Sequence, residues 1–409
     1  MNIVLEPGAA ALLDELHRAG FGAYAVGGCV RDSLLGLAPH DWDLCTAARP
    51  GQVMELFGED RCIPTGLQHG TVTVKRDGKL YEITTFRTEG RYSDGRHPDS
   101  VAFVPDLRED LARRDFTINA MAYSAEEGLC DPFGGREDLA RGVVRAVGEP
   151  LRRFGEDALR ILRLYRFAAR FGFAINEATE AAAKQLAAHL DCVSAERIEE
   201  ELNKLLAAPQ PGAYLEPEVL AFVLPELPPE ELTKARRRID ALPAGTEQVS
   251  ARWAALLLPL GETGARKALK RLKCSNARTD GAAVLVRECG EKTPDALDKC
   301  DLRLQAKRLL GKYDLHTVQQ LTALWTALAP EEKASFDALR AEAEALTAQG
   351  ACCRISQLAV NCRDLMEACA APGPGLRRVL EALLEEVITG RLPNEKTELL
   401  AFAAGFSAS

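Results

Sequence analysis

Two acidic side chains near the N-terminus have the spacing of a metal-binding pair. Asp41 and Asp43 are separated only by Trp42 in the segment "HDWDLCT". On a β-strand, residues two apart point to the same face, so both carboxylates would project together while Trp42 faces the opposite way. Carboxylate oxygens beside phosphate oxygens suit Mg²⁺, and two such ions can clamp the attacking and leaving oxygens of a phosphoryl displacement. A lone D-x-D pair is also typical of a solvated turn.

Residues on either side of this pair could complete a phosphate site. Gly27-Gly28 would let the backbone approach a triphosphate without a Cβ in the way. Arg31 opens the next predicted helical stretch, where N–H groups and a guanidinium could hold an anion. Glu82 alternates with apolar neighbours on a predicted strand in "LYEITTF". It could orient a metal or accept the proton of an attacking hydroxyl, and an edge-strand carboxylate facing water is the open alternative.

A third stretch, "GEDALRILRLYRFAARFGF" (155–173), combines the apolar period of a buried helix with a row of arginines. The basic positions follow at helical spacing: Arg160, Arg163, Arg166 and Arg170. Residues three apart on a helix are side-by-side neighbours, so Asp157 and Arg160 would form an adjacent acceptor and donor. An ordinary surface ion pair has the same spacing. The additional arginines favour phosphate binding, because they extend the row with unpaired positive charge.

The elements that must position these groups fall into two regions. In the first, β-branched and aromatic content predicts strands at 23–30, 40–46, 71–75 and 80–86. Helical periods predict helices at 9–19 and 50–58, and Asp77-Gly78 predicts a tight hairpin turn. Beyond Glu149 strand signals nearly vanish, and helical periods alternate with loops that contain Pro or Gly. The predicted fold class is therefore α+β, with a small mixed β-sheet at the N-terminus followed by an all-α remainder.

Length, composition and net charge indicate the number of domains, the compartment and the kind of partner to expect. Its 409 residues exceed what a single core usually supports, so two to four domains are expected. No apolar run reaches the length of a bilayer span, and the acidic N-terminal segment argues against a signal peptide. The 12 cysteines include no C-x-x-C pair, so free thiols in a cytoplasmic protein are expected. The net charge of −9 argues against nonspecific nucleic-acid binding but conceals local patches.

The motifs, taken in order, resemble those of class II CCA-adding enzymes (the tRNA nucleotidyltransferase and bacterial poly(A) polymerase family), in the short bacterial form without an HD domain. Four segments carry the resemblance: "VGGCVRDSLLGLAPHDWDLCT" (26–46), "LARRDFTINAMAY" (111–123), "GEDALRILRLYRFAARF" (155–171) and "AERIEEELNKLL" (195–206). The segment "LPNEKTELLAFA" (392–403) resembles the tail of the short enzymes. The resemblance spans most of the chain.

The resemblance implies a catalytic nucleotidyltransferase head over residues 1–140 and a helical neck that reads the nucleotide base over 141–208. A helical body over 209–305 and a helical tail that binds tRNA over 306–409 would follow. Asp41 and Asp43 would be catalytic and hold Mg²⁺, with Glu82 as a third candidate catalytic carboxylate. The candidate nucleotide-binding residues are Gly28, Arg31, Arg114, Asp157, Arg160, Arg163 and Arg166. Asp115 receives no assigned role and could pair with Arg113 or Arg114.

Asp157 and Arg160 also suggest how a base could be chosen without a nucleic-acid template. Cytosine and adenine both present an amino donor beside a ring-nitrogen acceptor, whereas guanine and uracil present the reverse order. A carboxylate and a guanidinium at a fixed separation can therefore accept C and A. A wrong base leaves buried charged groups unpaired, at a cost of about 1–3 kcal/mol per group.

The expected function is template-independent addition of C, C and A to the 3′ end of tRNA from CTP and ATP, with release of pyrophosphate. A poly(A) polymerase or an A-adding-only relative is the alternative, and a noncatalytic RNA-binding adaptor is a third reading. The stretch 87–107 reads as a mobile loop near the active site. In the family, a loop at this place helps the switch from C to A addition, which favours full CCA addition.

The expected partners are the acceptor stem and 3′ end of tRNA, CTP and ATP, with no membrane. A homodimer is left open, because the sequence does not show the oligomeric state. Two basic segments, 234–240 and 265–278, are candidates for contacts to tRNA phosphates. A solvated helix face explains either segment equally well.

Overall fold

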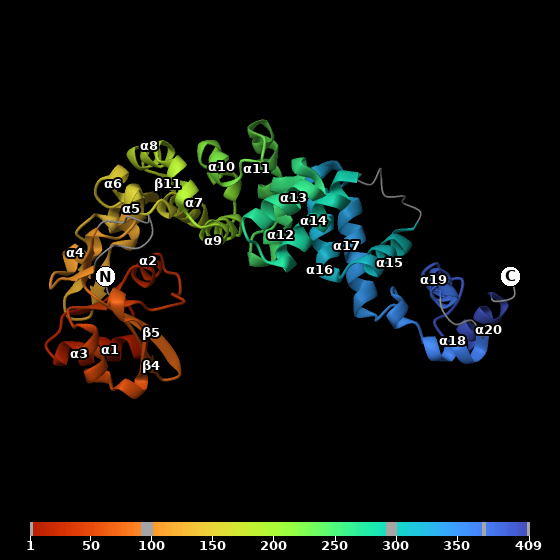
Figure 1. The fold of residues 1–409 in the computed structure, drawn as a ribbon, viewed down its shortest axis with the longest axis horizontal. Coiled ribbons are helices and arrows are strands. Elements are labelled where there is room, and N and C mark those ends of the chain that lie inside the picture. The colour runs from red at the N-terminus through yellow and green to blue at the C-terminus, as the bar shows by residue number, and fades with distance from the viewer. Residues whose placement is uncertain (1–2, 91–100, 292–300, 370–373, 407–409) are drawn as a thin grey trace. The chain divides into compact units, whose positions relative to one another are not determined.

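A computed structural model of the chain describes residues 3–90, 101–291, 301–369 and 374–406 (Figure 1). The chain divides into two compact units, Met1–Pro229 and Glu230–Ser409. The first unit contains a β-sheet and all four of the sequence motifs described above. The second unit is helical.

A seven-stranded sheet forms the base of the first unit, with strand order β3-β4-β5-β2-β1-β8-β9. Its strands are β1 (Ala23–Val26), β2 (Leu44–Thr46), β3 (Cys62–Gly66), β4 (Thr71–Arg76), β5 (Lys79–Thr85), β8 (Ala122–Ser124) and β9 (Gly128–Cys130). The β2–β5 pair is parallel and the other pairs are antiparallel. The sheet is therefore mixed, as predicted. Every residue of β1 and β2 is buried, which fits central strands covered on both faces.

The predicted hairpin joins β4 to β5. Asp77 and Gly78 have φ angles of 49° and 76°, the positive values that a two-residue type I′ turn requires. Arg76 pairs with Lys79 across the turn. Downstream, β6 (Arg87–Glu89) and β7 (Val101–Phe103) pair as a separate antiparallel ribbon, at the two ends of the stretch expected to be a mobile loop. The middle of that stretch, 91–100, lies outside the described residues.

Five helices accompany the sheet: α1 (Pro7–Arg18), α2 (Gly28–Leu34), α3 (Pro50–Phe57), α4 (Leu107–Ala112) and α5 (Gly135–Arg141). The helices expected at 9–19 and 50–58 are confirmed. The strand expected at 23–30 is wrong beyond Val26, because Gly27 turns the chain with φ 77° and ψ −121° and α2 begins directly after it. The strand expected at 40–46 begins only at Leu44.

Five further helices complete the first unit: α6 (Pro150–Glu156), α7 (Leu159–Phe171), α8 (Glu177–Gln185), α9 (Ala195–Leu206) and α10 (Pro217–Val223). The single helix expected over the arginine-rich stretch is instead two helices. Asp157 is extended, with φ −145° and ψ 106°, and separates α6 from α7. A short parallel pair of strands, β10 (Val143–Val144) and β11 (Ala174–Ile175), lies among these helices.

The second unit contains helices throughout its described residues, in line with the predicted all-α remainder (Figure 1). They are α11 (Leu232–Asp240), α12 (Val249–Leu257), α13 (Gly261–Arg271), α14 (Asn276–Glu291), α15 (Leu302–Lys312), α16 (Leu315–Leu328), α17 (Lys333–Ala348), α18 (Cys362–Cys369), α19 (Pro374–Ile388) and α20 (Lys396–Phe406). The last three helices share a core that includes Leu365, Leu383 and Leu399. None of the helices in the described ranges is long and apolar enough to cross a membrane.

Candidate active site

One cavity of about 610 Å³ in the first unit gathers nearly all the predicted site residues. Its lining comprises basic side chains (Arg31, Arg113, Arg114, Arg160, Arg163, Arg166, Arg170 and Lys204), acidic side chains (Asp41, Asp43, Asp115 and Asp157), and Gly27, Gly28, Asn119 and Phe167. Basic groups outnumber acidic ones by eight to four, so the cavity attracts anions although the whole chain is acidic. Glu82 is the one predicted site residue that is not part of this lining.

The carboxylates of Asp41 and Asp43 both open to the cavity, while Trp42 between them is buried. The predicted alternation is therefore confirmed, although both aspartates precede β2 instead of lying within it. Val26 N–H donates to the carbonyl oxygen of Asp43 at 3.0 Å, so β1 holds the extended chain that leads into β2. The pair is thus fixed by the central strands of the sheet.

Negative charge gathers around Asp43. The side chain is open to the cavity on one side and enclosed by protein on the others, and this desolvation raises its pKa. The charges of Glu82 and Asp41 raise the pKa further, and Arg114 opposes them. Leu44 pairs with Ile83 in the parallel ladder, which brings the segment of Asp43 beside Glu82. Glu82 therefore acts on this site through its charge from an exposed position on β5.

The glycine turn leaves room for a guanidinium. A Cβ on Gly27 would lie 2.9 Å from Arg114 Nη1, and the positive φ of Gly27 disfavours other residues there. Arg31 on α2 is buried, and its guanidinium donates to Asp32 at 2.8 Å and to Asn119 Oδ1 at 2.5 Å. Burial lowers the pKa of Arg31, and Asp32 counteracts the effect. The Arg31 side chain is thus largely committed to partners inside the protein.

An aromatic ring supports the arginine row. The guanidinium groups of Arg31, Arg163 and Arg166 lie 5.2, 5.7 and 3.9 Å from the centre of the Phe167 ring. Phe171 lies parallel to Phe167, with 6.3 Å between centroids, and Arg170 lies over its ring. Cation–π attraction lets like-charged groups share one wall, because the ring faces carry negative charge density. The apolar period of α7 therefore supports the arginines as well as the core.

Acidic partners fix most of these arginines. Asp115 accepts from Arg163 at 2.6 and 2.8 Å, and also from Asn119 and from the Phe116 N–H. The expectation that Asp115 pairs with Arg113 or Arg114 is wrong, because a different carboxylate, Asp110, binds those two arginines. Burial alone would raise the pKa of Asp115, but Arg163 and the Asn119 hydrogen bond outweigh it and hold the pKa well below its usual range. Asp115 also raises the pKa of Arg163.

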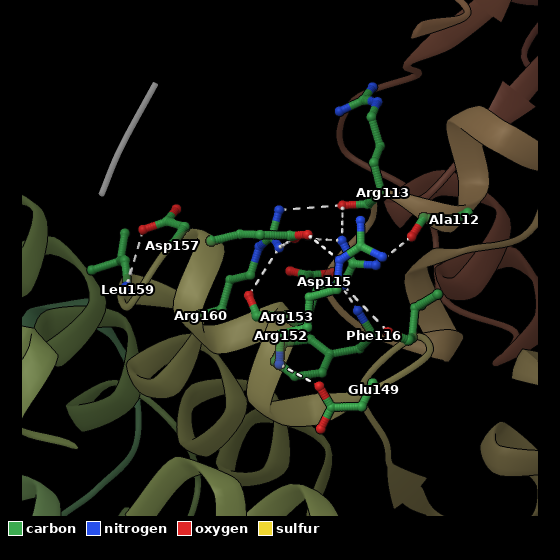
Figure 2. A network of polar contacts seen from close by, with 12 residues as sticks. Ala112, Arg113, Asp115, Phe116, Glu149, Arg152, Arg153, Asp157, Leu159 and Arg160 are labelled. Atoms are coloured by element: carbon green, nitrogen blue, oxygen red, sulfur yellow. Dashed lines mark hydrogen bonds and ion pairs between the residues drawn. The ribbon is translucent and has the colours of Figure 1, made fainter. Parts of the chain in front are cut away.

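Asp157 and Arg160 reach the same cavity from different backbone settings (Figure 2). The carboxylate of Asp157 accepts from the Leu159 N–H at 3.1 Å and from Arg197 Nη2 at 2.8 Å. Arg160, on α7, donates to Glu156 at 2.8 Å and to the carbonyl oxygens of Arg153 and Arg113. The two side chains are therefore held separately and do not form the helical neighbour pair that the sequence suggested.

Arg153 ties the arginine helices to the segment that carries Arg113 and Arg114 (Figure 2). Its guanidinium donates to the carbonyl oxygens of Ala112 at 2.6 Å and Arg113 at 3.1 Å, and to Glu156 at 2.7 Å. Sequence reasoning missed Arg153, Arg197 and Asp110. Arg197 lies on α9 in the fourth motif, so the motif could have indicated it. Arg153 and Asp110 are recognised only from the tertiary contacts that they make in the fold.

Comparison with known proteins gives matches over most of the chain. Residues 23–145 match a family model described as the poly A polymerase head domain. Residues 172–228 match one described as a probable RNA- and SrmB-binding site of polymerase A, and residues 245–403 match a putative tRNA nucleotidyltransferase domain 2. The chain is 38% identical over 408 residues to the CCA-adding enzyme of Limosilactobacillus fermentum, covering 96% of this chain and 95% of that protein.

Solved structures give the same picture. The crystal structure of the Bacillus stearothermophilus CCA-adding enzyme in complex with CTP matches with a TM-score of 0.82 and 33% identity, covering 99% of this chain and 98% of that one. The Thermotoga maritima CCA-adding enzyme complexed with tRNA matches in fold, with a TM-score of 0.71 at 21% identity over 98% of this chain and 96% of that one.

Proposed function

The chain belongs to the CCA-adding enzymes, and on that premise we propose how its cavity carries out the reaction. The reaction is template-independent addition of C, C and A to the 3′ end of tRNA from CTP and ATP, with release of pyrophosphate. The observation that carries the proposal is the composition of the cavity. Asp41 and Asp43 share it with Asp157 and Arg160, so phosphoryl transfer and base choice can occur on one bound nucleotide.

Asp41 and Asp43 are proposed to hold Mg²⁺. The family's nucleotidyl-transfer chemistry calls for a divalent cation, and two exposed carboxylates on one wall offer the hard oxygen ligands that Mg²⁺ prefers. Within the described ranges, no cluster of three or more His, Cys, Asp and Glu side chains includes them, so Asp41 and Asp43 are the two residues that would hold the cation. When bound, the cation lowers the pKa of the attacking 3′ hydroxyl and offsets charge on the leaving pyrophosphate. Glu82 is proposed as a third catalytic carboxylate that acts beside Asp43 on the adjoining strand.

The triphosphate is proposed to lie between the glycine turn and the arginine wall. Gly28 lets the backbone approach, and Arg31 holds this turn against Asn119. Arg114 is proposed to bind phosphate directly, because its side chain lines the cavity and its charge acts on Asp43. Arg163 and Arg166 add positive charge beyond it. Preorganised donors of this kind stabilise charge as it develops on the leaving group.

Asp157 and Arg160 are proposed to read the base. Each is fixed by protein partners before a nucleotide arrives, so neither can turn to suit guanine or uracil. The helical neck over 141–208 would then provide base reading, with the body over 209–305 and the tail over 306–409 binding tRNA. Exposed lysines on α13 are candidate phosphate contacts. Because its substrates are tRNA and nucleoside triphosphates, the protein is proposed to act in the cytoplasm.

Incubation of the protein with labelled CTP or ATP and a tRNA lacking its 3′ end tests this function. The expected product gains two C residues and then one A. Asp43→Asn should lower kcat by about a hundredfold or more with the tRNA KM unchanged, because a cation ligand is lost while the RNA contacts remain. A long A tract would instead indicate a poly(A) polymerase. The absence of incorporation by the unaltered chain would contradict the proposed function.

A further inference from the structure

Asp110, on α4, is a carboxylate with no exposed surface that binds three different groups. Its Oδ1 accepts from Arg113 Nε at 3.0 Å and from the backbone N–H of Arg87 at 3.3 Å. Its Oδ2 accepts from Arg114 Nη2 at 3.3 Å. Burial of an ionised carboxylate is costly unless hydrogen-bond or ion-pair partners satisfy it. The three contacts therefore fix the positions of Asp110 and of the groups that bind it.

Arg114 depends on Asp110 for its position. Its guanidinium extends to the glycine turn, where a Cβ on Gly27 would meet Nη1 at 2.9 Å, and its charge acts on Asp43. The ion pair with Asp110 therefore sets where the guanidinium stands between the glycine turn and the carboxylate pair. A shift of this side chain would move the proposed phosphate contact away from the reacting centre.

The third contact of Asp110 is a hydrogen bond with the β6–β7 ribbon. Arg87 is the first residue of β6, and its N–H points to Asp110. Its guanidinium also donates to the carbonyl oxygen of His69. Phe103 of β7 packs on Gly70, where an added Cβ would lie 2.6 Å from Phe103 Cε1. The base of the ribbon and Arg114 thus share one buried carboxylate.

We propose that Asp110 is a positioning residue for nucleotide addition, which holds Arg114 at the triphosphate and couples its position to strand β6. The inference rests on the proposed function of the cavity and deepens it. An ion pair that only stabilised the fold could be replaced without changing how tightly the triphosphate binds. A positioning residue affects the binding of phosphate while leaving the choice of base intact.

The first test replaces Asp110 in the full-length chain. Asp110→Asn should raise the KM for CTP and for ATP, and the Ki for inorganic pyrophosphate, by about tenfold or more, since a charge-assisted contact is lost. The ratio of C and A to G and U incorporation should not change. The matched control is Asp106→Asn at the N-cap of the same helix, because the Asp106 side chain caps α4 through the Arg108 N–H and asparagine caps equally well. Equal KM and Ki values for Asp110→Asn and the control would overturn the proposal.

The second test leaves Asp110 in place and serves if Asp110→Asn does not fold. Arg87→Ala removes the side chain and keeps the backbone N–H, whereas Arg87→Pro removes both. Proline is tolerated at the first residue of a strand. Arg87→Pro should raise the KM for CTP by about twofold or more above the value for Arg87→Ala, since one hydrogen bond to Asp110 is lost. Identical KM values for the two variants, with both folded by circular dichroism, would overturn the coupling to β6.

The unaltered chain distinguishes a failure of the proposed function from a failure of the role of Asp110. If it adds no nucleotide to tRNA, the proposed function fails. If it adds C, C and A while the variants keep its KM and Ki values, only the role of Asp110 fails.

Discussion

Most charged side chains of the cavity are held by a protein partner before any ligand arrives. Asp115 binds Arg163, Glu201 binds Arg166, Asp32 binds Arg170 and Glu156 binds Arg160. Fixed groups cost little reorganisation when charge develops in a transition state. The same fixation would account for the base selectivity proposed for Asp157 and Arg160, because a donor or acceptor that cannot turn cannot satisfy the wrong base.

Asp157→Ala should blur base choice more than it slows addition. Removal of the carboxylate takes away one of two reading groups, so discrimination of C and A against U and G should fall by about tenfold or more. Single-nucleotide incorporation with each of the four triphosphates measures the change. Asp191→Ala, at an exposed carboxylate in the same unit, is the control. Unaltered selectivity in Asp157→Ala would contradict the assignment of this residue to base reading.

Asp115→Asn should destabilise the fold in a pH-dependent manner. The pKa of Asp115 is lower in the folded chain than its ordinary value of 3.8, so its stabilising effect is present above that value and is lost as the pH falls toward the lowered pKa. At pH 7 the free energy of unfolding of the variant should be about 2–3 kcal/mol lower than that of the unaltered chain, because Arg163 keeps a charge without its partner. Urea unfolding at pH 7, 5 and 3.5 measures this. A loss of unfolding free energy that is as large below pH 4 as at pH 7 would contradict the ion-pair account.

At the scale of elements, patterned segments were predictable and junctions were not. The helices at 9–19 and 50–58 and the Asp77-Gly78 hairpin follow from local periodicity and turn chemistry, and the structure confirms them. The break at Asp157 was missed, because the apolar period continues through it and the stabilising contact comes from Arg197 on another helix. The carboxylate pair and its facing were predictable from alternation alone.

The partners of the arginines were not predictable in the same way. Asp110 and Asp115 both lie beside Arg113 and Arg114 in sequence, yet Asp115 binds Arg163 and Asp110 binds the nearby arginines. Sequence spacing leaves both pairings open, and the packing of α7 against the head decides between them. Candidate residues could therefore be named from motifs, whereas their contacts required the fold.

Substitution of Arg197 tests whether α9 positions Asp157, the proposed base-reading residue at the junction of α6 and α7. Arg197→Met keeps the length of the side chain but removes the donor to Asp157, which lies at the α6–α7 break. Misincorporation of U and G should rise by about fivefold or more, and Arg197→Lys should restore part of the selectivity, because the ammonium is a single-point donor. Four-nucleotide incorporation assays and melting temperatures measure both. A variant that loses stability but keeps its selectivity would show that Arg197 supports the fold only.

At the scale of the whole molecule, the sign of the local charge at the cavity differs from the sign of the net charge. The chain carries a net charge of −9, yet the cavity is basic and helices of the second unit carry exposed lysines. An acidic remainder limits nonspecific attraction to nucleic acid, while local basic surfaces allow binding where it is needed. Affinity for tRNA should therefore depend on a few positions and on salt.

Lys267→Glu combined with Lys270→Glu should weaken tRNA binding without changing the KM for CTP. Both lysines are exposed on α13. If each contacts a phosphate, the slope of log affinity against log salt should become shallower by roughly 1.4 to 1.8, since each contact contributes about 0.7 to 0.9. Fluorescence anisotropy with labelled tRNA over a salt series measures this slope, with Lys75→Glu on β4 as the control. An unchanged slope would assign α13 to a solvated face.

The arginine wall on Phe167 and Phe171 has one more consequence. Guanidinium groups from α2 and α7 stand side by side on these rings in the folded chain, and the four acidic side chains of the cavity offset only part of the charge of its eight basic ones. A polyanion that enters relieves the remaining repulsion and is favoured for that reason alone, whatever base it carries. The by-product of each addition is such a polyanion. The excess of basic side chains therefore favours retention of this by-product in the cavity and slows its departure.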